Sequence, residues 1–553
     1  MKKIKFIAPL LAFALFSCDN YLDVNTSPNT LVYDDVTPAL LLPGAQVASY
    51  RVQSTTMNQL GNVFMNSWTR NVQGFGNGFD RELQLTIDNS FYNGIWDGLY
   101  RSVNNFQGII DYPNADGSQD YFVAIAKICK SHYLQYIVDL YGDAPYTEAF
   151  KGASNLTPAY DDDYAIYQSL ITNLEEARAI IAAADPDAID PTPNDAMLGG
   201  DLDRWVEFAN TIELRILLRM SNLTGAQATY RDAKLATIVG GPFISDNVSI
   251  NPGFAATTDS QMSPVVNTFF YNVAGENQQN RSFIAMTGHA WKSLQSIAST
   301  NPQPAGAYQI IPSSPLNYPN LTDPRSGRLF TGGVAGGAVG PRRAVIQGQN
   351  VVTIGAVGTT YPGVPSRLGA FGHIAPYGEY DSTPGLSNAE AFAGCDGFVM
   401  TYSEACFLLA EAAARADNGE AGYAGFTDAQ TWFDEGIIDN FAFRNAVVGS
   451  YVATINTKPN FGYAASTTFD EKLHAIMYQK WVALMGIHGI ESFVEYNRTG
   501  FPFTPLSLNA TQTRKPYRLI YPVSEYVANS ANVPSVTAPE AFTINTKTPF
   551  WIQ

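Results

Sequence analysis

The residue types that most often carry catalysis are present in this sequence, but no spacing joins them into a reaction centre. The chain has neither an H-E-x-x-H motif nor a G-x-S-x-G nucleophile turn. Its five histidines are scattered and show no metal-ligand spacing: His132, His289, His373, His474 and His488. Fifty acidic residues leave the carboxylate pair of a glycoside hydrolase open, because only separation in space would identify such a pair. We therefore expect a noncatalytic protein without a cofactor.

Two acidic segments resemble metal sites in composition, and both have a simpler structural interpretation. Asp161-Asp162-Asp163 precedes a helical pattern, where acidic side chains cap the first turn and favour the helix dipole. The segment from Tyr112 to Gly117 contains the Asn, Asp and Gly of a calcium loop. However, Tyr112 replaces its first acidic ligand and Val123 its terminal glutamate. We interpret the first segment as a helix start and the second as a turn, and we predict no metal site. A structural calcium elsewhere stays open.

Cys18 is the cysteine whose chemistry is specified by its neighbours. Three lysines near the N-terminus precede an apolar run, residues 6–16, that is too short for a permanent membrane-spanning helix. The run ends in Leu15-Phe16-Ser17-Cys18, which resembles the lipobox of bacterial lipoproteins. In that motif a peptidase cuts before the cysteine, and the new N-terminus carries acyl chains such as palmitate. We therefore predict a signal peptide at residues 1–17 and a lipid anchor at Cys18, since several acyl chains hold a protein durably on a membrane.

The composition of the chain that follows this anchor is that of a large acidic protein. Of the 553 residues, 46% are hydrophobic, which is ample for a sizeable core. Cleavage before Cys18 removes three lysines and no acidic residue, so the formal net charge changes from −17 to −20. Such a charge repels nucleic acid and anionic lipid headgroups. An uncharged ligand or a peptide is a better partner for such an acidic protein than nucleic acid or anionic lipid.

The remaining cysteines are too few for a disulfide framework. They are Cys129, Cys395 and Cys406, an odd number. At most Cys395 and Cys406 pair with each other. Cys129 and Cys406 lie within helical patterns, where a buried free thiol is the simpler interpretation.

Apolar residues recur at three- and four-residue steps through most of the chain, which predicts helices. After a polar tether at residues 18–38, these patterns cover residues 43–68, 91–110, 121–140, a segment following Asp163, 204–222, 402–416, 429–443 and 471–486. Successive amphipathic helices form hairpins, so we expect a mainly α scaffold of helix pairs. Residues 240–394 are rich in Gly, Pro, Asn and Thr, apart from a periodic run at 283–297. They predict a loop-rich half with short strands, such as one at 343–354.

Landmarks along the chain resemble SusD/RagB-family nutrient-binding outer-membrane lipoproteins of Bacteroidetes. The first landmark combines Asn20-Tyr21-Leu22-Asp23 with Asn25-Thr26-Ser27-Pro28-Asn29. Six more follow in the family's order: Asp139 to Tyr146 (DLYGDAPY), Trp205 to Arg215 (WVEFANTIELR), Asp323-Pro324-Arg325, Met400 to Glu404 leading to Leu408 to Ala412, Gln479 to Leu484 (QKWVAL), and Arg518 to Pro522 (RLIYP). The pattern is most similar to the SusD-like branch, whose last long helix ends in a segment like Glu491 to Gly500 (ESFVEYNRTG).

The resemblance implies one α-rich domain over residues 18–553, in which tetratricopeptide-like helix pairs form a scaffold beside a loop-rich half. It also implies a noncatalytic, surface-exposed lipoprotein of the outer membrane that captures an oligosaccharide and delivers it to a SusC-like TonB-dependent transporter. The same architecture with a peptide ligand is the second hypothesis, and a surface glycoside hydrolase is the third. The apolar residues of the landmarks fall at helical spacing, so we expect these motifs to be scaffold and not ligand site.

Ligand residues are expected on loops that carry aromatic and hydrogen-bonding side chains above the helical frame. Two stretches have this character, residues 68–79 and 361–380. The predicted ligand-binding residues are Trp68, Arg70, Phe75 and Phe79 in the first stretch, and Tyr361, Arg367, Phe371, His373 and Tyr377 in the second. For each of them the alternative stays open that the side chain fills a gap beneath a long loop.

Overall fold

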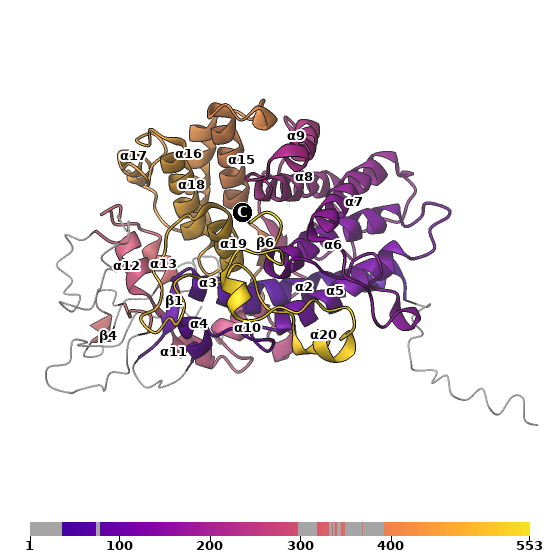
Figure 1. Cartoon of the computed structure of the whole chain (residues 1–553), viewed down its shortest axis with the longest axis horizontal. Coiled ribbons are helices and arrows are strands. Elements are labelled where there is room, and N and C mark those ends of the chain that lie inside the picture. The colour runs from indigo at the N-terminus through magenta and orange to yellow at the C-terminus, as the bar shows by residue number, and fades with distance from the viewer. Residues whose placement is uncertain are drawn as a thin grey trace, which may run out of the picture.

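Helices dominate the computed structural model, which describes residues 36–72, 78–296, 318–330, 334–335, 338–339, 344–348, 368 and 392–552 (Figure 1). The N-terminal half contains α2 (Pro38–Val52), a π-helical turn (Gln53–Met57), α3 (Asn58–Phe64), α4 (Asp80–Gln84), α5 (Gly94–Ile110), α6 (Asp120–Tyr141), α7 (Asp163–Ala183), α8 (Leu202–Arg219) and α9 (Gly225–Ile238). Later in the chain follow α15 (Tyr402–Asp417), α16 (Ala429–Phe443), α17 (Tyr451–Ile455), α18 (Phe469–Leu484), α19 (Gly489–Thr499) and α20 (Val523–Ala528). The mainly α prediction is therefore confirmed.

Local signals in the sequence explain where the long helices begin and end. The side chain of Asp162 accepts a hydrogen bond from the backbone N–H of Ala165, so the predicted acidic helix start is an N-cap of α7. Thr468 and Glu471 form a reciprocal capping box at the start of α18. Gly142 ends α6 at a φ of 75°, a backbone angle that glycine adopts without steric strain.

The helices pack in pairs, most of which are neighbours along the chain. The most extensive contacts join α6 to α7, α15 to α16, α2 to α5, and α5 to α6. In Figure 1 the purple helices α5 to α8 and the orange helices α15, α16 and α18 form two groups, with α19 between them. This arrangement of packed pairs is the predicted scaffold.

A close crossing joins α3, in the first part of the chain, to α19, in its last part. Gly61 of α3 lies against Gly489 of α19, and a β-carbon built on Gly61 would come within 2.0 Å of the Gly489 carbonyl carbon. The Asn58 side chain donates a hydrogen bond to Gly486 O (2.9 Å) and accepts one from Gly489 N (3.0 Å). The absence of a side chain at Gly61 therefore allows backbones 428 residues apart to touch.

The loop-rich part contains short helices and two-stranded antiparallel sheets. Its helices are α10 (Pro264–Phe269), α11 (Gln279–Phe283), α12 (Gly288–Leu294) and α13 (Ser326–Leu329). The strand pairs are β1 (Trp68–Arg70) with β3 (Ile284–Met286), β2 (Val248–Ile250) with β6 (Gly397–Met400), and β4 (Val334–Ala335) with β5 (Ala338–Val339). Only residues 344–348 of the predicted strand at 343–354 are described, and there Val345 forms a single bridge to Thr287.

Two predicted helices were too long for the same reason. The helix predicted at 43–68 ends at Phe64, and Trp68 already belongs to β1. The helix predicted at 283–297 begins only at Gly288, where Thr287 caps α12 by accepting a hydrogen bond from Ala290 N. Residues 68–70 and 284–286 pair with each other across the sheet, a long-range interaction that overrides local periodicity.

The three cysteines within the described residues, Cys129, Cys395 and Cys406, are all free thiols. Cys129 and Cys406 are buried, as predicted, and burial raises the pKa of both thiols. Within the described ranges, each helix is too short or too polar to cross a lipid bilayer. Cys18 and the signal segment lie outside these ranges.

Candidate functional site

The predicted ligand loops lie largely outside the described residues. This applies to Phe75, Tyr361, Arg367, Phe371, His373 and Tyr377. Trp68 has no exposed surface and packs edge-on against Phe269, with ring centroids 5.3 Å apart. Phe79 is also buried, against Phe283, while the buried Arg70 forms an ion pair with Asp80 at 2.6 Å. The burial of Trp68 and Phe79 favours the gap-filling alternative for these two rings, whereas a binding role of the loops stays a prediction.

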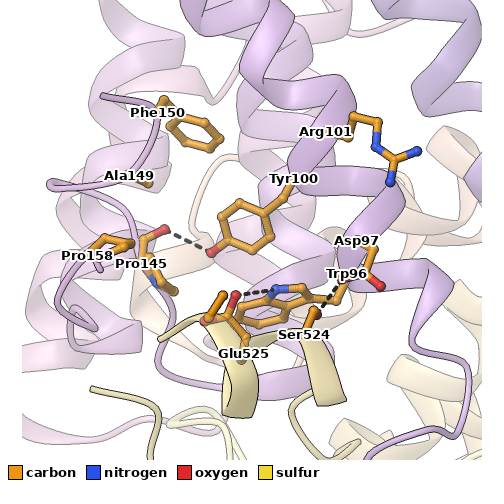
Figure 2. A pocket seen from close by; sticks show the side chains of 11 residues that line it. Trp96, Asp97, Tyr100, Arg101, Pro145, Ala149, Phe150, Pro158, Ser524 and Glu525 are labelled. Atoms are coloured by element: carbon orange, nitrogen blue, oxygen red, sulfur yellow. Dashed lines mark hydrogen bonds between the residues drawn. The ribbon is translucent and has the colours of Figure 1, made fainter. Parts of the chain in front are cut away.

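A cavity of about 420 Å³ opens between α5, the loop after α6, and α20 (Figure 2). Its volume lies in the usual range for small-molecule sites. It is lined by Trp96, Asp97, Tyr100, Arg101, Pro145, Ala149, Phe150, Pro158, Ser524, Glu525 and Ala528. The sequence analysis placed Trp96 and Tyr100 on one helix but did not predict this cavity, because its third wall comes from α20, more than 400 residues later.

Hydrogen bonds between α20 and its neighbours hold the floor of the cavity. The indole Nε1 of Trp96 donates to Glu525 Oε1 at 3.3 Å, and Tyr160 Oη donates to Glu525 Oε2 at 2.7 Å. Ser524 Oγ donates to Asp97 Oδ1 at 2.7 Å. Both carboxylates of the cavity therefore already accept protein hydrogen bonds, and α20 is joined directly to α5.

Three aromatic rings form one wall of the cavity. Tyr100 lies against Trp96 with ring centroids 4.7 Å apart, and it stacks on Phe150 at 5.8 Å with an interplanar angle of 29°. Tyr100 Oη donates to the carbonyl of Pro145 at 2.8 Å, and burial raises the pKa of this phenol well above its ordinary value. The phenol therefore stays protonated and keeps the ring in place.

Arg101 stands at the outer edge of the cavity. Its side chain points away from the rings in Figure 2, and the residue is exposed. Among the described residues, none forms a hydrogen bond or an ion pair with its guanidinium group. Five N–H donors are thus available beside a rigid aromatic wall, an arrangement suited to binding a hydroxyl-rich ligand by stacking and hydrogen bonding.

The acidic residues before α7 are close enough together to hold a cation, yet they have structural roles. Single oxygens of Asp143, Asp162 and Asp163 lie within 4.8 Å of one another. Asp162 caps α7, Asp143 Oδ1 accepts from Asp163 N at 3.1 Å, and Asp163 Oδ2 accepts from Phe550 N at 2.8 Å. Burial raises the pKa of Asp163 to about 7. These backbone hydrogen bonds account for the cluster.

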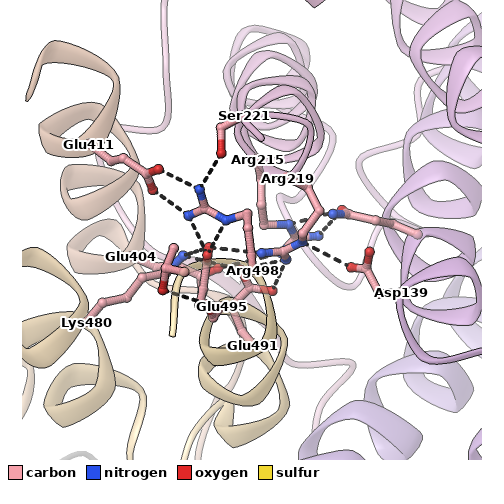
Figure 3. A network of polar contacts seen from close by, with 12 residues as sticks. Asp139, Arg215, Arg219, Ser221, Glu404, Glu411, Lys480, Glu491, Glu495 and Arg498 are labelled. Carbon is pink, nitrogen blue, oxygen red and sulfur yellow. Dashed lines mark hydrogen bonds and ion pairs between the residues drawn. The ribbon is translucent and has the colours of Figure 1, made fainter. Parts of the chain in front are cut away.

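A second concentration of ionisable groups lies in the middle of the helical scaffold (Figure 3). Arg219 of α8 pairs with Glu491 (2.9 Å) and Glu495 (3.0 Å) of α19. Arg498 donates to both carboxylate oxygens of Glu411, each at 2.6 Å. Each of these five side chains is at most 2% exposed, so the network lies beyond the reach of a ligand.

Opposite charges keep these buried groups ionised. Burial opposes the charged form of Glu495, but Arg498, Lys480 and Arg219 outweigh it and lower the pKa of this carboxyl to about 2. Lys480 donates to Glu495 at 2.8 Å and to Glu491 at 3.2 Å. The network is therefore an internally neutralised part of the scaffold.

A sequence model of a family described as "Starch-binding associating with outer membrane" matches residues 28–284 and 340–522, well over half of the chain. The chain belongs to the SusD-like family. Membership in it places the protein among noncatalytic binding proteins associated with the outer membrane, as the resemblance implied. No curated protein matches the sequence.

Solved structures of SusD homologues share the fold. A chitin-binding SusD homologue from Flavobacterium johnsoniae is 20% identical, with a TM-score of 0.64 over 89% of this chain and 94% of that one. A Bacteroides vulgatus outer-membrane protein described in terms of nutrient binding is 17% identical, with a TM-score of 0.64 over 94% and 100%. A SusD homologue from Bacteroides fragilis is 18% identical, with a TM-score of 0.62 over 90% and 95%.

The SusD-like landmarks of the sequence converge on the buried network. The landmarks supply its residues Asp139, Arg215, Glu404, Glu411, Lys480, Glu491, Glu495 and Arg498. Two of the scattered histidines also contact it: His488 lies 3.1 Å from Glu404, and His132 lies 3.1 Å from Arg215. The expectation that the landmarks are scaffold is thereby confirmed for these residues, which are all buried.

Proposed function

We propose that this SusD-like protein captures a neutral oligosaccharide at the cell surface and delivers it to a SusC-like TonB-dependent transporter. The observation that carries the ligand proposal is the pair of partly exposed rings Tyr100 and Phe150, packed on the buried Trp96, beside the exposed guanidinium of Arg101. Aromatic rings stack on the apolar faces of sugars, and the charged donors of Arg101 match their hydroxyl groups. The family's starch-binding description and the chitin-binding homologue support the same ligand class.

The walls of the cavity favour a glycan over a peptide. An extended peptide gains affinity by pairing its backbone with the edge of a sheet. The residues that line this cavity belong to α5, α20 and loops, and none of them belongs to a strand. An extended peptide would therefore find no strand edge to pair with here, whereas a sugar needs none.

Changing Arg101 to Ala should weaken glycan binding about tenfold or more, because a hydrogen bond to a charged group contributes roughly 1.5–3 kcal/mol. The measurement is calorimetry with chito-oligosaccharides and malto-oligosaccharides as probes. The charge-matched control is Lys458→Ala, located between α17 and α18, which lie on the opposite side of Figure 1 from α20. It should bind like the wild type.

The same titrations distinguish the cavity from the predicted loops. Wild-type affinity in Arg101→Ala, together with lost binding in Tyr361→Ala, would place the ligand at the stretch 361–380 instead. Binding of a peptide library with no response to any glycan would favour the second hypothesis. The Trp68→Ala protein belongs in the series as well, and its burial predicts a lowered melting temperature.

We propose that Cys18 carries the anchor that holds the protein on the outer membrane, facing outside. Changing Cys18 to Ala should move the protein from the membrane pellet to the soluble fraction, since no acyl chains could then be attached. Fractionation and mass spectrometry measure this directly. A wild-type protein without acyl mass, and an unchanged distribution of the variant, would contradict the anchor.

Extraction in mild detergent should recover the protein together with its transporter. A pull-down through a tag at the C-terminus is expected to retain a large TonB-dependent receptor encoded beside this protein. The control is an unrelated lipoprotein with the same tag, expressed in the same cells. If the tagged protein is repeatedly recovered alone while the receptor is expressed, the proposed partnership is wrong.

A further inference from the structure

We propose that the ligand site continues past Phe150 into a second cavity along α5, so that a linear oligosaccharide occupies both cavities at once. The second cavity has a volume of about 360 Å³. It is lined by Val36, Leu41, Asn104, Gly108, Asp111, Tyr112, Pro113 and Phe150. This inference rests on the proposed glycan function and adds the length and the direction of the ligand.

Phe150 joins the two cavities because it lines both. The ring is held from two sides. Tyr100 stacks on it in the first cavity, and the Lys130 ammonium lies 5.4 Å from its centroid. Lys130 is buried and donates to Gln107 Oε1 at 2.5 Å. Phe150 itself has a φ of 63°, an uncommon angle for a residue with a β-carbon. The ring therefore has a fixed position between the cavities.

A single face of α5 forms the floor beneath both cavities. Asp97 and Arg101 line the first, and Asn104, Gly108 and Asp111 line the second. Their spacing alternates between four and three residues, which places all five on one side of a helix. With a rise of 1.5 Å per residue, this strip is about 21 Å long. A linear chain lying on it would run from α20 toward the start of α2.

The second cavity offers the same kinds of contact as the first. Tyr112 supplies a ring, and Asn104 supplies an amide with both donors and an acceptor. The Asn104 side chain is half-buried, and no residue in the described part of the chain forms a hydrogen bond with it. This amide is therefore available to exchange hydrogen bonds with a sugar hydroxyl at this position.

Gly108 makes a selective test feasible. It lies in the last turn of α5 and lines the second cavity but not the first, so the larger side chain of Gly108→Leu would obstruct the second cavity and leave the first one unchanged. Leucine also has a higher helix propensity than glycine, and thermal melting should show a folded protein. The matched control is Gly94→Leu, on the same helix but outside both cavities, where a β-carbon would meet nothing within 4 Å.

The experiment titrates the wild type and both variants with chito- and malto-oligosaccharides, from the disaccharide to the hexasaccharide. Wild-type affinity should rise with chain length. Gly108→Leu should lose roughly tenfold in affinity for the long chains and should bind the disaccharide like the wild type. Asn104→Ala should show the same length-dependent loss, while Phe150→Ala should weaken binding of both short and long chains.

The outcomes separate this inference from the proposed function. Affinity that is independent of chain length, or long-chain binding unaffected by Gly108→Leu and Asn104→Ala, would overturn the extension while leaving glycan binding intact. Equal loss for short and long chains in Gly108→Leu would also overturn it. Failure of the wild type to bind any glycan would contradict the proposed function, and the extension with it.

Discussion

Replacing Gly61 by Ala should lower the free energy of unfolding by about 3 kcal/mol or more. The new β-carbon would lie 2.0 Å from the Gly489 carbonyl carbon and 2.1 Å from Ile490 N, both of them backbone atoms. Such atoms cannot move aside as the end of a flexible side chain can. The crossing of α3 and α19 would have to open, which also separates Asn58 from Gly486 and Gly489.

Gly44 provides the matched control for this substitution. It lies within α2, and a β-carbon there would meet nothing within 4 Å. Gly44→Ala should therefore raise the free energy of unfolding by about 0.5–1 kcal/mol, because alanine is the better helix former. Urea unfolding of both variants measures the difference. A Gly61→Ala protein as stable as the wild type would mean that the two helices do not cross at these glycines.

Replacing Arg219 by Met should destabilise the protein by about 3–5 kcal/mol at neutral pH, since it removes one partner from a buried ionic network. Arg219 pairs with Glu491, Glu495 and Asp139, and its side chain has no exposed surface. The control is Arg204→Met at the start of the same helix, where the guanidinium donates one hydrogen bond to Asn247 O. That loss should cost about 1 kcal/mol.

The destabilisation by Arg219→Met should shrink as the pH falls. In the wild type the pKa of Glu495 is lowered from 4.5 to about 2, so its stabilising contribution is present above 4.5 and is lost as the pH falls toward 2. Without Arg219 the pKa of this carboxyl rises, and the variant has less of that contribution to lose. Urea unfolding at pH 7 and at pH 4 measures the difference in the free energy of unfolding between the wild type and Arg219→Met. If the difference in the free energy of unfolding between wild type and variant grows on acidification, Arg219 does not hold these carboxylates in their charged form.

The sequence by itself determined most of the helices and the family. The predicted helix at 429–443 coincides with α16, and the predicted 121–140 differs from α6 by one residue at each end. Periodicity is reliable for such segments because they bury one face against neighbouring helices over several turns. Caps such as Asp162 act within one turn of their own helix, so their role is also visible in the local sequence.

Only the tertiary structure decided what depends on distant partners. Trp68 was predicted to bind ligand because it begins a stretch rich in aromatic and polar residues. Its strand pairs with residues 284–286, however, and its ring lies in the core. Arg219 and Glu491 stand 272 positions apart, and neither local sequence shows that they meet. The cavity beside Tyr100 exists because α20 bonds to α5 from the far end of the chain. Pairing of this kind follows from how the helices pack in space, which periodicity along one segment does not encode.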